Sequence, residues 1–170
     1  RDLEEHGRLV VHDEHSRLRR CRARAHAVPS SAWVKLTHAR VPAPGQDIRA
    51  VMFSHNDQML AVGGRSGTLR LYSMPRGELV RDIDGHRQRI RAIAFSTDGS
   101  YIASSGEDRL VHVAPLAAGQ GYNLPQRPAK ILALAFCGPQ QLATAGSDNQ
   151  IHLWDVATKE EIGSLRGHTG

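Results

Sequence analysis

The chain has 170 residues and a formal net charge of +5, and 40% of its residues are hydrophobic and 23% charged. This length and composition suit a folded globular chain with a core of its own, and nothing in them demands disorder. The sequence has no run of about 18 apolar residues to span a bilayer and no secretory signal pattern. We therefore expect a cytoplasmic protein that makes no use of a membrane.

The residues that could carry metal or catalytic chemistry do not form a known motif. Cys21 and Cys137 are the only cysteines and are expected to be free thiols, because no CxxC pair exists. His6, His12 and His15 lie near Cys21, but their spacing matches no zinc motif. The glycine-rich stretch GGRSG lacks the Lys-Ser/Thr pair of a phosphate loop, and no GxSxG stretch is present. The sequence thus predicts no metal, no cofactor and no enzyme activity.

Residues 1–47 contain alternating segments that predict a few strands. AWVKLTHARV (32–41) alternates apolar and polar residues, RLVVH (8–12) is a further strand candidate, and RVPAPGQ (40–46) predicts a turn. An arginine run at 17–24 would place Arg20, Arg22 and Arg24 on one face of a strand. A solvated outer face explains this run best, since no aromatic residues accompany it for base stacking, and nucleic-acid binding is the less favoured alternative.

A repeat of about forty residues follows. The segment IRAVMFS (48–54) recurs as IRAIAFS (90–96) and again as ILALAFC (131–137). Each copy precedes a polar turn and a second apolar segment with a glycine in register, at Gly64, Gly106 and Gly146. The alternation of apolar and polar residues predicts strands, and no segment keeps a helical apolar face. Four short antiparallel strands in each copy predict an all-β fold, a β-propeller fragment of about three blades.

These repeats resemble the WD-repeat (tryptophan-aspartate) propeller family, which carries Gly-His near the start of a repeat and Trp-Asp near its end. Gly85-His86 precedes the second copy, Trp154-Asp155 closes the third, and Gly167-His168 follows. The resemblance implies blades at about 48–86, 87–127 and 128–167. It also implies that residues 1–47 are a linker or part of a preceding degenerate blade, and that the chain is cut at the start of a further one. The rest of the propeller would then come from missing sequence or from self-association.

In this family a His, a Ser or Thr, a turn Asp and a Trp form a hydrogen-bonded network in each blade. Matching positions assign that structural role to His86, Ser104, Asp108, Thr144, Asp148 and Trp154. Every blade departs from the pattern. Ala114 and Tyr72 stand at Trp positions, Ser66 at an Asp position, and Arg127-Pro128 in place of Gly-His. A partly made network is costly, so we expect less rigid blades but the same fold.

The resemblance implies a function in binding peptides or proteins on the loops of the propeller. It places Arg65, Arg87, Arg89 and Arg109 on one rim, and such a rim would suit an acidic or phosphorylated peptide. The alternative for these arginines is that they are ordinary turn residues paired with Asp82, Asp84 and Glu107. The alternatives for function are a regulatory or sensor domain of a larger signalling enzyme, such as a kinase or nucleotide-switching protein, and, less favoured, RNA binding.

Overall fold

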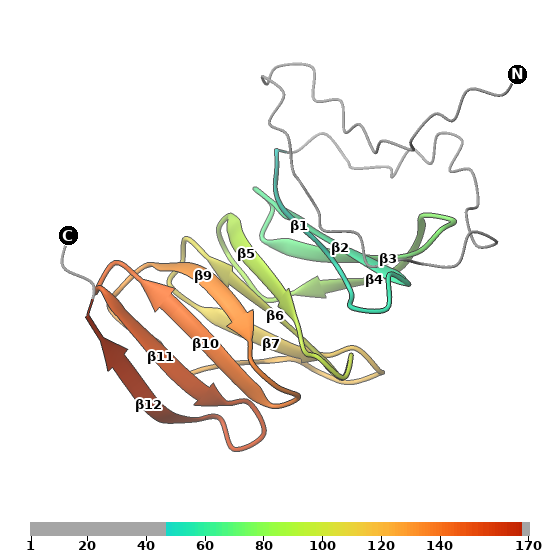
Figure 1. The fold of residues 1–170 in the computed structure, drawn as a ribbon. Helices are drawn as coiled ribbons and strands as arrows, with labels where there is room; N and C mark the ends of the chain where they lie inside the picture. The colour runs from blue at the N-terminus through green and yellow to red at the C-terminus, as the bar shows by residue number, and fades with distance from the viewer. Residues whose placement is uncertain (1–46, 168–170) are drawn as a thin grey trace, which may run out of the picture. The chain divides into compact units, whose positions relative to one another are not determined.

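The computed structural model describes residues 47–167, and the only regular secondary structure in this part of the chain is the β-strand, with turns and loops between strands (Figure 1). It contains no helix of the length and apolar character that crossing a membrane requires. The strands, the arginine run and the histidines predicted within residues 1–46 lie outside the described residues, and so does His168.

The described strands form three separate four-stranded sheets, each an antiparallel meander. The first sheet contains β1 (Ile48–Phe53), β2 (Met59–Gly64), β3 (Thr68–Ser73) and β4 (Glu78–Asp84). The second contains β5 (Ile90–Phe95), β6 (Tyr101–Gly106), β7 (Val111–Pro115) and β8 (Tyr122–Asn123). The third contains β9 (Ile131–Phe136), β10 (Gln141–Gly146), β11 (Gln150–Asp155) and β12 (Glu160–Arg166). The predicted all-β fold of three four-stranded blades is confirmed.

The sheets pack face against face, with β5 lying between β1 and β9 (Figure 1). Two apolar clusters fill the junctions, because alternate residues of each strand point to opposite faces of its sheet. The first cluster joins Leu69 and Leu71 of the first blade to Ile90 and Phe95 of the second. The second cluster joins the second blade to the third and includes Val111, Val113, Leu142 and Trp154. The second blade is therefore covered on both faces.

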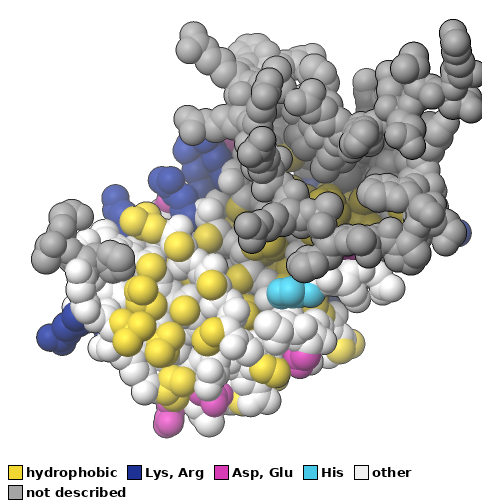
Figure 2. Space-filling view, viewed as in Figure 1, with side chains coloured by type: hydrophobic (Ala, Val, Ile, Leu, Met, Phe, Trp, Pro, Cys, Tyr) yellow, Lys and Arg dark blue, Asp and Glu magenta, His cyan; other side chains and the backbone are white. Residues whose placement is uncertain are grey.

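The two flanking blades leave large apolar side chains exposed. On the first blade these are Ile48, Val51, Met52, Phe53, Leu79 and Val80, and on the third they are Leu132, Ile162 and Leu165. Figure 2 shows hydrophobic side chains spread over the third sheet. On the second blade Ile90, Ile93 and Phe95 are buried. Exposed apolar area of this kind is what further packing would cover.

The second blade has a much shorter fourth strand than the others. β8 pairs with β7 at His112–Asn123 and Val113–Tyr122 only. Pro115 has no N–H to donate to a longer partner, and its carbonyl accepts a hydrogen bond of 3.0 Å from the Arg81 guanidinium of the first blade. A second Arg81 nitrogen donates to the carbonyl of Ala117 at 3.0 Å. A side chain thus replaces the backbone donors of the absent strand residues.

Candidate binding surface

The turns between the second and third strands have the same geometry in all three blades. The carbonyls of Gly64, Gly106 and Gly146 accept from the N–H three residues later. The residues that donate, Gly67, Arg109 and Asn149, all have positive φ, at 80°, 64° and 58°. In each turn a side-chain oxygen of Ser66, Asp108 or Asp148 accepts from the N–H two residues later. The backbone of this rim is therefore set by repeating local chemistry.

The linker from β4 to β5 is held between two of these turns. On one side, a Cβ on Gly67 would lie 2.3 Å from the carbonyl oxygen of His86, so only glycine allows this close approach. On the other side, the N–H of Glu107 donates to the carbonyl of Arg89 at 2.9 Å. Asp108 accepts from the N–H of Arg87 at 3.0 Å. The structure thus brings the linker and both turns together at one end of the first two blades.

Four arginines predicted to form a binding rim lie on this linker and these turns. Arg65, Arg87 and Arg109 are exposed, and Arg89 is half-buried. Within residues 47–167 none of the four makes an ion pair, although the Arg109 guanidinium donates to the carbonyl of Pro128 at 3.4 Å. Figure 2 shows a group of Lys and Arg side chains at the upper edge of the described sheets.

The acidic residues that could have neutralised this rim have other partners. Asp82 pairs with Arg70 at 3.3 Å, and Glu107 pairs with Arg91 at 2.6 Å. Asp84 accepts from the hydroxyl of Thr68 at 3.0 Å. Within residues 47–167, the guanidinium groups of the rim therefore have no carboxylate partner.

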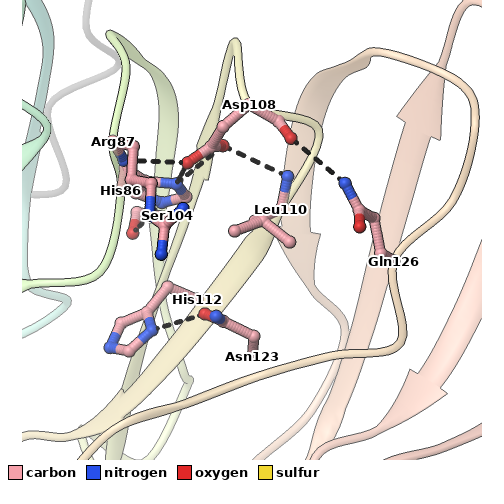
Figure 3. A network of polar contacts seen from close by, with 8 residues as sticks. All are labelled: His86, Arg87, Ser104, Asp108, Leu110, His112, Asn123 and Gln126. Carbon is pink, nitrogen blue, oxygen red and sulfur yellow. Dashed lines mark hydrogen bonds and ion pairs between the residues drawn. The ribbon is translucent and has the colours of Figure 1, made fainter.

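A buried polar network in the second blade fixes the linker (Figure 3). His86 contacts Asp108 through Nδ1 at 3.1 Å and Ser104 through Nε2 at 3.0 Å. Its side chain is 1% exposed, and that of Asp108 is 9% exposed. Asp108 also accepts from the N–H of Leu110 at 3.2 Å. The network ends at Ser104, because Ala114, which is buried, occupies the position expected for a Trp.

The third blade satisfies its matching residues in a different way. The indole Nε1 of Trp154 donates to the hydroxyl of Thr144 at 3.0 Å in the buried core. Asp148 contacts Nε2 of His152, a residue of β11, at 2.9 Å, and Nδ1 of the same ring contacts Glu161 at 2.7 Å. Hydrogen bonding to His152 lowers the pKa of Asp148. In the third blade the turn aspartate therefore contacts a histidine of a strand, whereas in the second blade it contacts a histidine of the linker.

The structure corrects the sequence alignment of the linker before the third blade. The N–H of Ser147 donates to the carbonyl of Lys130, as that of Glu107 does to Arg89, so Lys130 and Arg89 correspond. Counting back from this pair places Gln126-Arg127, rather than Arg127-Pro128, opposite Gly85-His86. The Arg127 guanidinium lies 5.4 Å from the ring centroid of Trp154 and pairs with Glu161. An arginine thus packs on the tryptophan from a position where the second blade has its histidine.

A polar cavity of about 520 Å³ opens beside the first two blades. It lies between the end of β4 with the following linker and the segment 119–123, and His112 is in its wall. His112 is 7% exposed, and its Nδ1 is 2.8 Å from Oδ1 of Asn123 (Figure 3). Burial lowers the pKa of His112, an effect that the bond to Asn123 opposes.

Sequence analysis missed His112, His152, Glu161 and the contacts of Arg127. One signal was present, since His112 and His152 occupy the same place in their repeats and Arg70 occupies it in the first. Among residues 47–167 no group of His, Cys, Asp and Glu side chains is arranged to hold a metal ion. Cys137 is an exposed free thiol.

A family model described as "WD domain, G-beta repeat" matches residues 37–73, 77–113 and 122–155. The chain therefore belongs to the WD40 repeat family, whose domains generally act as non-enzymatic scaffolds for protein–protein interaction.

Two curated relatives and one solved structure illustrate the range of similar proteins. The chain is 33% identical over 120 residues to mouse (Mus musculus) mitogen-activated protein kinase-binding protein 1, covering 65% of the chain and 8% of that protein. It is 28% identical over 127 residues to the WD repeat-containing protein slp1 of Schizosaccharomyces pombe, covering 71% and 26%. The crystal structure of the RRP9 WD40 repeats matches with a TM-score of 0.70 and 21% identity, covering 75% of this chain and 41% of that one, which supports the fold.

Proposed function

We propose that this chain is a non-catalytic binding module that holds an acidic or phosphorylated segment of a protein partner on its arginine rim. The rim consists of Arg65, Arg87, Arg89 and Arg109. The observation that carries the proposal is that these arginines form no ion pair within residues 47–167, while the nearby Asp82 and Glu107 are paired elsewhere.

The chemistry of the rim suits an anionic peptide. A guanidinium can donate two parallel hydrogen bonds to a carboxylate or phosphate, which a single ammonium cannot do in the same geometry. The loops are held by the buried network of His86 and Asp108, so little ordering of the backbone is needed on binding. Lys130, which is exposed at the position matching Arg89, extends the positive charge toward the third blade.

The relatives fit a protein partner. One is named as a protein that binds a mitogen-activated protein kinase. The partner of this chain is proposed from the chemistry of its own rim.

Charge reversal on the rim tests the proposal. The 170-residue chain is titrated into a fluorescent peptide with two phosphoserines flanked by glutamates, and into its unphosphorylated form. We expect Arg87→Glu to weaken binding about tenfold, and the affinity of the unmodified chain to fall as salt rises. The side chain of Arg87 makes no hydrogen bond or ion pair within residues 47–167, so the fold should persist.

A matched control lies at the end of the first sheet opposite to the rim. Arg76 is in the turn between β3 and β4, its side chain is 80% exposed, and Arg76→Glu makes the same change in net charge. This variant should bind within about twofold of the unmodified chain. Equal losses of affinity in the two variants would mean a general charge effect and would contradict binding at the rim. The proposal would also be overturned if the unmodified chain bound neither of the two peptides.

A further inference from the structure

The second blade has a cavity beside its short fourth strand. β8 has two residues, whereas β4 and β12, the fourth strands of the other blades, have seven each. The cavity of about 520 Å³ lies between the end of β4 and the segment 119–123, which includes β8. This volume falls within the usual range of ligand sites in proteins, about 300–1,000 Å³.

One face of β4 is directed toward the second blade and the cavity. Ile83 belongs to the apolar cluster that joins the first two blades. Arg81, two residues earlier and therefore on the same face, donates to the carbonyls of Pro115 and Ala117 in the second blade. Both of these partners are uncharged, so the Arg81 guanidinium brings an unneutralised positive charge to the wall of the cavity.

The acidic residues of β4 lie on its other face. Asp82 and Asp84 alternate with the cavity-facing residues, so their side chains point away from the second blade. There Asp82 contacts Arg70 at 3.3 Å, and Asp84 accepts from the hydroxyl of Thr68 at 3.0 Å. The two aspartates therefore border the cavity with their backbone, and β4 directs no carboxylate into it.

The other walls of the cavity supply a second guanidinium and neutral donors. Arg87, a residue of the rim, lines the cavity from the linker and makes no ion pair within residues 47–167. Gln120 lines it from the opposite side, and its exposed side-chain amide has no hydrogen bond to another described residue. The amide oxygen of Asn123 is used by His112, which leaves the amide nitrogen to donate (Figure 3). This set of groups suits an anion.

Two glycines shape the wall around His112. A Cβ on Gly121 would lie 2.2 Å from Nε2 of the ring, and a Cβ on Gly85 would lie 2.4 Å from Cγ. A side chain at either position would therefore push the ring from its place or fill part of the cavity. Both glycines line the cavity, so its shape depends on the close approach of backbone to the histidine ring.

We propose that this cavity binds the phosphate group of a phosphorylated side chain in the segment that the rim holds. The inference rests on the proposed function and adds a preference for phosphate over carboxylate. Arg87, which belongs to both the rim and the cavity, and the amide of Gln120 donate to the phosphate oxygens, and Arg81 adds a second positive charge. A phosphorylated side chain carries about two negative charges near neutral pH and three acceptor oxygens, whereas glutamate carries one charge and two oxygens. Two guanidinium groups therefore favour the phosphate.

The test compares phosphate with carboxylate in the same peptide. The 170-residue chain is titrated into the peptide with two phosphoserines and into a second peptide that has glutamate in place of both. We expect the phosphorylated peptide to bind at least about tenfold more tightly. Equal affinities for the two peptides would overturn the cavity and leave the rim standing, because the rim accepts either anion.

A matched pair of variants assigns the preference to the cavity. Gln120→Glu replaces a donor by a negative charge in the cavity wall, so it should weaken binding of the phosphorylated peptide at least about fivefold and leave the glutamate peptide within about twofold. Gln140→Glu makes the same change at an exposed position between β9 and β10, and should leave both affinities within about twofold. Neither glutamine side chain has a hydrogen bond to another described residue, so both variants should fold. Equal effects of the two variants would overturn the cavity.

A variant that changes no charge provides a second check. Gly121→Ala places a methyl group against the ring of His112, so the preference for the phosphorylated peptide should fall to about the level of Gln120→Glu. The dispersion of its amide NMR spectrum shows whether it folds. If a folded Gly121→Ala chain kept the full preference, the cavity would be overturned, and if this variant failed to fold, Gln120→Glu would still decide.

A small probe separates the cavity from the rim. Nα-acetyl-phosphoserine methylamide is titrated into the 170-residue chain, and the ring signals of His112 and the side-chain amide signals of Asn123 are followed by NMR. These signals should shift in a saturable way, and the absence of such a shift would overturn the cavity. Binding of the probe as tight as that of the peptide would assign the cavity to free phosphorylated molecules and overturn its role for a rim-bound segment. Probe binding by a chain that binds no peptide would overturn the proposed function instead.

Discussion

The second and third blades satisfy the same turn aspartate by different routes. In the second blade the partner is His86, which comes from the linker and so fastens the loop that leads into the blade. In the third blade the partner is His152, which comes from the adjacent strand, while the linker contributes Arg127 to Trp154 and Glu161. In both blades a histidine contacts the carboxylate of the turn aspartate. The difference shows that this histidine can come from different positions in the repeat.

The location of the donor has consequences for the surface above it. The linker that His86 fastens carries Arg87 and Arg89, so the polar core of the second blade supports the proposed rim directly. In the third blade the turn aspartate has no side-chain partner from the linker, although the Ser147 N–H of the same turn donates to the linker carbonyl of Lys130. We therefore expect changes in the second network to affect the loops, and changes in the third to affect mainly the packing of the blade.

The largest expected effect comes from removing the tryptophan that only the third blade has. Trp154→Ala deletes a side chain that is 3% exposed and packed in the second apolar cluster. The free energy of unfolding should fall by about 4 kcal/mol, through lost apolar burial and a cavity. Urea denaturation followed by circular dichroism measures it. Ile162→Ala, at a 53% exposed position in the same blade, should cost under about 1 kcal/mol, and a similar loss for both would contradict the expectation.

A second comparison removes the two turn aspartates. Asp108→Ala leaves His86 and the N–H groups of Arg87 and Leu110 without their acceptor in a site where the carboxylate is 9% exposed. We expect a loss of about 3 kcal/mol. Asp148→Ala should cost about 1 kcal/mol, because Asp148 is 25% exposed and water can replace it. Chemical denaturation of both variants checks the order, and the reverse order would show that the linker contributes little to stability.

A smaller effect is expected at the positive-φ position of each turn. Arg109 adopts φ of 64° with a long side chain, whereas Asn149 at the matching position tolerates this conformation better. Arg109→Gly should raise the free energy of unfolding by about 0.5–1 kcal/mol, and Asn149→Gly should change it by less. Thermal unfolding measures both. If Arg109 belongs to the binding rim, the stabilised variant will bind the phosphorylated peptide more weakly.

The smallest expected effect is the pH dependence that comes from His112, whose partner Asn123 carries no charge. Burial lowers the pKa of His112 below its ordinary value of 6.5, so the unfolded chain takes up a proton that the folded chain resists. The contribution of neutral His112 to stability is present above pH 6.5 and is lost as pH falls from there toward the lower folded pKa. NMR titration of the ring should give a midpoint below 6.5. In His112→Phe, the decline of the unfolding free energy between about pH 7 and 5 should become shallower. A midpoint above 6.5 would contradict this expectation.

The strands were predictable because their signal is local. Alternation in IRAVMF, IRAIAF and ILALAF predicts a strand in each repeat, and the structure has β1, β5 and β9 at these residues. The short length of β8 was not predicted, and the Arg81 guanidinium that donates to the carbonyls of Pro115 and Ala117 comes from another blade. Local pattern cannot report a partner that is distant in sequence.

The polar networks were predictable only where a family motif marks them. Motif positions identified His86, Ser104 and Asp108, and the structure places them within hydrogen-bond distance. They did not identify His152, because the motif assigns the histidine of the network to the linker, whereas His152 lies on β11 and contacts Asp148 from there. The four rim arginines could be placed from turn positions, whereas the close approach of Gly85 and Gly121 to the ring of His112 arises only after folding.

The Arg81 contact gives the second blade a property that the other two lack. With the carbonyls of Pro115 and Ala117 held by a side chain, the exposed residues 117–120 are not needed to continue a strand ladder. Lengthening this loop costs only slowly increasing closure entropy. A fluorescent or affinity tag is therefore best inserted directly after Ala118, next to the two carbonyls that accept from Arg81.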